Sequence, residues 1–93
     1  MQRGTQIVYI PDHVGAMYTA PSWLEKRGCD WGFVSSIRGD VAFCRYWSKT
    51  EIGELRTKSC SEGTPIRNLK EVRSAPQATV DAMLARIDAE ETS

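Results

Sequence analysis

The first half of the chain alternates short runs of β-branched and aromatic residues with polar breaks. Thr5–Ile10 is the first such run, and it stops at Pro11, which lacks the backbone N–H that a sheet needs. Trp31–Ile37 and Val41–Trp47 flank Arg38–Asp40, a compact turn with a central glycine, where positive φ costs little. The pattern predicts a first strand and then a β-hairpin. Both sides of the 41–47 run are apolar, so the pattern leaves open which side is buried.

Weaker patterns continue the β structure toward residue 72. Leu55–Cys60 alternates well enough to predict a fourth strand. Ser61–Pro65 contains glycine and proline, so it is interpreted as a turn or a single helical turn. Ile66–Leu69 favours a short helical turn, and Lys70–Val72 a closing fifth strand. Residues 12–30, between the first two strands, show no period and are expected to form a long loop.

The end of the chain carries the period of an amphipathic helix. Ser74 and Gln77 have the spacing of a capping box, and Pro76 suits the first turn of a helix. An apolar stripe follows at helical spacing, formed by Val80, Met83, Leu84 and Ile87. A helix of about four turns is marginal by itself, so we expect the stripe to pack on the β domain or against a second copy of the chain.

Length and composition predict one small domain. With 93 residues, 41% of them hydrophobic and 26% charged, the chain can build one core and no second one. We expect residues 1–73 to form a small β domain with a long first loop, and residues 74–93 a helix and tail. No apolar run approaches the roughly 20 residues of a membrane helix, and three cysteines without a C-x-x-C pair fit a reducing compartment. The sequence predicts a cytoplasmic protein without a membrane partner.

The order of these elements resembles that of Src-homology-3-like small barrels, including the KOW and Tudor types. A closer resemblance rests on three stretches within residues 4–72, namely Gly4–His13, Trp31–Ser36 and Val41–Trp47. They are similar to small uncharacterised bacteriophage and prophage proteins, in which a G-x-x-V-x-Y-x-P opening precedes a G-x-V-x-S strand and a V-F-x-R-Y strand. The resemblance implies a mainly β fold, a five-stranded Src-homology-3-like barrel followed by the C-terminal α-helix, in a phage-encoded protein of the host cytoplasm.

Charges are balanced overall but unevenly placed. Twelve basic and twelve acidic residues cancel, which disfavours a protein whose main task is to neutralise phosphates. Residues 1–73 still carry three excess positive charges, and residues 74–93 three excess negative ones. A basic strip can form from Arg45, Arg56, Lys58, Arg67, Lys70 and Arg73. The alternative is ordinary solvated surface; if the strip forms, the acidic tail can cover it within the chain or in a second copy.

Candidate chemistry is sparse. Cys29, Cys44, Cys60 and His13 make a donor set that tetrahedral zinc accepts, but they are not spaced in the close pairs of structural zinc sites. We therefore expect the cysteines to act as small hydrophobic residues. The sequence has no serine-nucleophile, phosphate-loop or metalloprotease motif and no carboxylate pair placed for acid–base work. It predicts no enzyme, no bound metal and no cofactor.

The aromatic residues indicate binding. They are more numerous than a small core can bury, so some are expected on a contact surface. The candidate binding residues are Trp23, Arg45, Tyr46, Trp47, Arg56 and Lys58. We expect a non-enzymatic module that binds a protein partner, such as a host or defence component. The alternative is nucleic-acid binding, with basic residues on phosphates and Tyr46 or Trp47 stacked on bases; a homodimer through the helix stripe is compatible with both.

Overall fold

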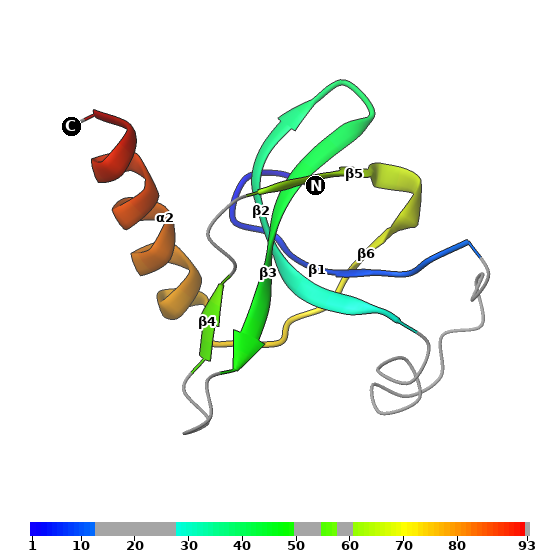
Figure 1. The fold of residues 1–93 in the computed structure, drawn as a ribbon, viewed down its shortest axis with the longest axis horizontal. Helices are drawn as coiled ribbons and strands as arrows, with labels where there is room; N and C mark the ends of the chain where they lie inside the picture. Colours follow the sequence, from blue (N-terminus) through cyan, green and yellow to red (C-terminus); the bar gives the residue numbers. More distant parts are fainter. Residues whose placement is uncertain (13–27, 50–54, 58–60, 93) are drawn as a thin grey trace.

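The computed structural model describes residues 1–12, 28–49, 55–57 and 61–92, which form a mainly β fold with one C-terminal helix (Figure 1). Among these residues, no helix has the length and apolar character needed to cross a membrane. In chain order the elements are β1 (Gln6–Tyr9), β2 (Asp30–Arg38), β3 (Val41–Lys49), β4 (Leu55–Thr57), β5 (Glu62–Pro65), the 3-10 turn η1 (Ile66–Asn68), β6 (Leu69–Glu71) and α2 (Gln77–Thr92). Most of the expected 12–30 loop, including Trp23, lies outside the described residues.

The described strands form one antiparallel sheet. Its order is β4-β3-β2-β1-β6, and β5 pairs with the first part of β3. The sheet therefore has six strands in the described part of the chain, not the five expected, and no pairing among them closes it into a ring. The extra strand is β5, where the sequence predicts a turn or a single helical turn because Gly63 and Pro65 are poor strand residues. It forms because β3 is long enough to pair with β5 through Val41–Cys44 and with β4 further along.

One face of the sheet holds the main core. The residues of β3 that are buried there, against β1 and β2, are Ala42, Cys44 and Tyr46. The sequence leaves open which side of β3 is buried in the core, and the structure shows that it is this side. The hydroxyl of Tyr46 lies 2.8 Å from Thr64 Oγ1 on β5. Burial raises the pKa of the Tyr46 phenol above its ordinary value.

The opposite face carries a row of three residues across β1, β2 and β3. Gln6 pairs with Phe33, and Phe33 pairs with Arg45, so the three side chains lie on the same face. α2, orange to red in Figure 1, packs on this face. The hydrophobic cluster that joins α2 to the sheet consists of Phe33, Val80, Leu84 and Ile87, with Met83 and Trp47 packed against it. The helix stripe is thus used within the chain, and a homodimer through the same stripe would require α2 to leave Phe33.

Gln6 fixes the start of α2 to the sheet. Its side-chain Nε2 donates to the carbonyl of Ala75 at 2.7 Å, and its Oε1 accepts from the backbone N–H groups of Ser74 and Ala75 at 2.9 and 2.8 Å. Ser74, expected to cap the helix, takes part in this contact instead, and its hydroxyl accepts a hydrogen bond from Trp47 Nε1. One polar side chain of a strand thus holds the connection between β6 and α2.

We expect Gln6→Ala to lower the free energy of unfolding by about 2–4 kcal/mol, because it leaves backbone groups of Ser74 and Ala75 without partners. Urea denaturation followed by tryptophan fluorescence and far-UV circular dichroism measures the loss. Gln2→Ala is the matched control, because Gln2 is exposed whereas Gln6 is buried. Equal midpoints for the two variants would contradict the role given to Gln6.

Candidate functional site

Two aromatic residues expected at the binding surface serve the packing of the fold. Tyr46 is 2% exposed and lies in the main core, so the expectation that its ring could stack on a base is wrong for this conformation. Trp47 points to the other face, where it is half-buried and packs on Phe33 with ring centroids 5.4 Å apart. Both rings are covered because one face of β3 packs in the main core and the other face packs under α2.

Arg45 and Arg56 are the expected binding residues that the structure brings together. They lie on the paired strands β3 and β4 and border the same hollow. Trp23 and Lys58 lie outside the described residues. Arg67 of the expected basic strip lines a different hollow beside η1. The strip is therefore divided: Arg45 lies on the face that α2 covers, whereas Arg56 pairs with Ser48 on the other face of β3.

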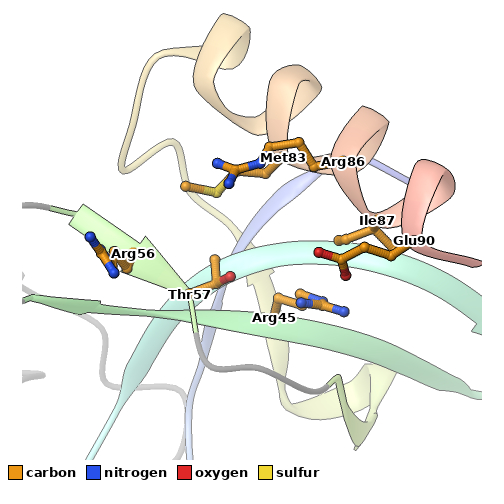
Figure 2. Close-up of a pocket in the computed structure, with 7 residues that line it drawn as sticks. All are labelled: Arg45, Arg56, Thr57, Met83, Arg86, Ile87 and Glu90. Atoms are coloured by element: carbon orange, nitrogen blue, oxygen red, sulfur yellow. The ribbon is translucent and has the colours of Figure 1, made fainter.

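The hollow between α2 and the strands β3 and β4 has a volume of about 350 Å³, and we call it the arginine groove. Its lining residues are Arg45, Arg56, Thr57, Met83, Arg86, Ile87 and Glu90. Three of them belong to the strands and four to α2. The strands and α2 lie on opposite sides of the hollow in Figure 2. The groove therefore exists only because α2 is docked on the sheet.

Positive charge dominates the arginine groove. Three arginines and one glutamate are among its lining residues, and the Glu90 carboxylate points toward Arg45 in Figure 2, whereas the guanidinium group of Arg56 is directed away from Arg45. Met83 and Ile87 add apolar surface from the helix. Such a site can bind an anion through charge-assisted hydrogen bonds and can contact apolar groups beside it.

Arg45 differs from the other two arginines of the groove. Its side chain is half-buried, whereas Arg56 and Arg86 are exposed. Its Nε is buried and has no hydrogen-bond partner among the described residues. A buried donor without a partner costs about 1–3 kcal/mol, so such a group calls for an explanation.

The strand register fixes the position of Arg45. Its partner across the sheet is Phe33, which α2 buries completely. The neighbouring Gly32 lets β2 approach β3 so closely that a Cβ at this position would meet the backbone of Arg45 and Tyr46. The backbone of Arg45 is thus held firmly, and its side chain points into the opening below Ile87 (Figure 2).

Arg86 and Glu90 are groove residues that the sequence analysis misses. The helix period places them on the polar side of α2, which is ordinarily solvated. They are one helical turn apart, and both lie next to Ile87 on the helix surface. The helix period therefore predicts that they share one edge of the apolar stripe. The period alone does not say which strand that edge of the helix faces, so their place in the lining of the arginine groove could not be deduced.

The two described cysteines are not brought together. Cys29 belongs to a cluster with Val8 and Ile10, and Cys44 belongs to the main core. Cys60 and His13, the other members of the zinc donor set, lie outside the described residues. In the described part of the chain, no group of three metal-ligating side chains is found.

Comparison of the chain with models of protein families, with curated proteins and with solved structures gives no match. The function is therefore argued from the geometry of the arginine groove. Its guanidinium groups, one carboxylate and apolar helix surface are the chemistry that a ligand would meet there.

Proposed function

We propose that this protein is a non-enzymatic binding module that holds an acidic segment of a partner protein in the arginine groove. The observation that carries the proposal is Arg45, whose buried Nε–H has no partner among the described residues. A carboxylate accepts from Nε and one Nη of an arginine together, so it would satisfy this donor in a bidentate pair. Arg86 adds positive charge to the same groove.

A protein segment fits the arginine groove better than a nucleic acid does. Surfaces that bind single strands combine positive charge with exposed aromatic rings on which bases stack. No aromatic residue of the described chain lines this groove. Glu90 would repel a continuous phosphate backbone. Met83 and Ile87 offer apolar contacts to peptide side chains.

The proposal includes the type of fold and the setting. A Src-homology-3-like barrel is supported by the antiparallel strand order and by the 3-10 turn between β5 and β6. Phage origin, and action on a host or defence component in the cytoplasm, are supported by the resemblance of residues 4–13, 31–36 and 41–47 alone. In this account the C-terminal helix forms one wall of the binding groove.

The test uses a short fluorescein-labelled peptide of alternating glutamate and serine, together with its glutamine counterpart. Fluorescence anisotropy with the whole chain should show saturable binding of the glutamate peptide and much weaker binding of the glutamine peptide. Arg45→Ala should weaken binding of the glutamate peptide about tenfold or more, as expected for a central arginine anchor. Arg45→Lys should restore little of it, because an ammonium group cannot form the bidentate pair.

Arg67→Ala is the matched control, because Arg67 is exposed and lies outside the arginine groove. Equal affinity for the two peptides, or equal effects of Arg45→Ala and Arg67→Ala, would contradict the proposal. A single-stranded oligonucleotide that binds more tightly than the peptide, with steep salt dependence and through Arg45, would favour the nucleic-acid alternative and overturn the protein partner.

A further inference from the structure

A second hollow adjoins the arginine groove and has a volume of about 500 Å³. It shares Arg45 and Ile87 with the arginine groove. Phe43 lines only the second hollow, and together with Ile87 it forms the apolar part of the lining. Phe43 lies two positions before Arg45 on β3, so both side chains project from the same face of the strand.

Phe43 is an aromatic residue that the core does not use. Its side chain is half-buried, and none of the three hydrophobic clusters of the described residues includes it. Its partner on β5 is Gly63, which is exposed and has no side chain to cover the ring. A Cβ at Gly63 would lie 3.4 Å from Cε1 of the ring. Apolar surface of Phe43 therefore remains open to the second hollow.

The charges around the second hollow favour an acidic segment over a basic one. Asp88 Oδ1 accepts a hydrogen bond from Arg3 Nη2 at 2.7 Å, so these two residues neutralise each other. The other charged residues of the lining, Arg38 and Arg45, are both positive. A segment whose carboxylate binds Arg45 can therefore continue past Phe43 without meeting an uncompensated negative charge in this lining.

The geometry of β3 sets the spacing that such a segment must have. Phe43 and Arg45 are two residues apart on one strand, which corresponds to about 6.6 Å along its axis. In an extended peptide, side chains two positions apart also project to the same side with this spacing, whereas neighbouring side chains project to opposite sides. An acidic residue on Arg45 therefore places the side chain two positions away over Phe43.

We propose that the acidic segment carries an apolar side chain two residues from its acidic group, and that this side chain packs on Phe43 in the second hollow; this rests on the function proposed above. The carboxylate binds Arg45, and the segment continues along Ile87, which lines both hollows. Recognition then requires a charge and an apolar group at a fixed spacing, so net negative charge alone is insufficient for tight binding.

Three labelled peptides of equal length test the spacing with the whole chain. Each has one central glutamate in a serine background; the first has no leucine, the second has leucines two positions to either side, and the third has leucines directly beside the glutamate. Leucines on both sides make the result independent of the direction in which the peptide runs. Fluorescence anisotropy should show that the second peptide binds about tenfold more tightly than the first and the third.

Phe43→Ala should remove the advantage of the second peptide and leave the affinity for the first peptide unchanged. Phe43→Leu should keep most of the advantage, because leucine preserves an apolar surface at this position. Val72→Ala is the matched control, since Val72 is half-buried and lines neither hollow, and it should leave all three affinities unchanged. A thermal melt of each variant confirms that the fold is retained.

The spacing proposal fails if the second and third peptides, which have the same composition, bind equally well. It also fails if a folded Phe43→Ala variant still prefers the second peptide over the first. In both cases the function proposed above stands as long as the leucine-free glutamate peptide binds more tightly than its glutamine counterpart. If that difference is absent, the function proposed above fails, and the spacing proposal fails with it.

Discussion

Gly32→Ala is expected to lower the free energy of unfolding by more than about 4 kcal/mol, a large part of the roughly 5–14 kcal/mol typical of a chain this size. A Cβ at Gly32 would lie against the carbonyl oxygen of Arg45, 2.8 Å from Cα of Tyr46 and 2.9 Å from the carbonyl carbon of Arg45. All of these are backbone atoms of β3, so rotation of a side chain cannot relieve the contact. The β2–β3 pairing must open, and the positions of Phe33 and Arg45 change with it.

Gly63→Ala is the matched control in another strand that pairs with β3. There the nearest atoms to a new Cβ are side-chain carbons of Phe43 and Val41, at 3.4 and 3.5 Å. These are ordinary contacts, so we expect a change in stability within about 1 kcal/mol. Differential scanning calorimetry compares the two variants. If Gly32→Ala melts at the same temperature as Gly63→Ala, the close approach of β2 to β3 described above is wrong.

Phe33→Ala is expected to cost about 3–5 kcal/mol, because the ring is fully buried between the sheet and α2. For a chain of this length, each kcal/mol shifts the melting temperature by about 4–8 °C. The loss of structure should be concentrated in α2, since a helix of this length is marginally stable without its packing partner. Far-UV circular dichroism and hydrogen exchange of residues 80–87 measure both effects.

Phe43→Ala provides the comparison, because Phe43 is a half-buried aromatic residue outside the cluster that joins α2 to the sheet. It should cost less than Phe33→Ala and leave the protection of the helix amides unchanged. Similar losses from both substitutions, with the helix amides still protected in Phe33→Ala, would show that Phe33 is not what holds α2 in place.

Local pattern was sufficient for the elements that carry a clear period. The runs ending at Pro11 and flanking Gly39 predict the first three strands, and the spacing of Val80, Leu84 and Ile87 predicts α2. Pattern could not choose between the two sides of β3, because Ala42, Cys44 and Tyr46 on one side are matched by apolar residues on the other. The register with β2 decides it, since the pairing with Phe33 puts Arg45 on the helix-covered face.

The contacts that form the arginine groove join residues far apart in the sequence, so the sequence pattern gives little indication of them. In the sequence, Gln6 is an ordinary polar residue of a strand. Its role depends on hydrogen bonds to the backbone of Ser74 and Ala75, which the local pattern does not indicate. β5 forms from residues of low strand propensity because β3 offers an edge to pair with. The helix period places Arg86 on the solvated side of α2, and its position in the lining of the groove follows from how α2 crosses the sheet.

The signal of Arg45 Nε–Hε in a ¹⁵N-correlated NMR spectrum tests the central claim most directly, because this buried donor is the group that the ligand should satisfy. Titration of the whole chain with the glutamate–serine peptide should shift this signal saturably and by more than the Nε–Hε signal of Arg67, which lies outside the groove. The glutamine counterpart should leave it in place. An Arg45 signal that stays fixed at saturating glutamate peptide, or that moves equally with both peptides, would contradict the account.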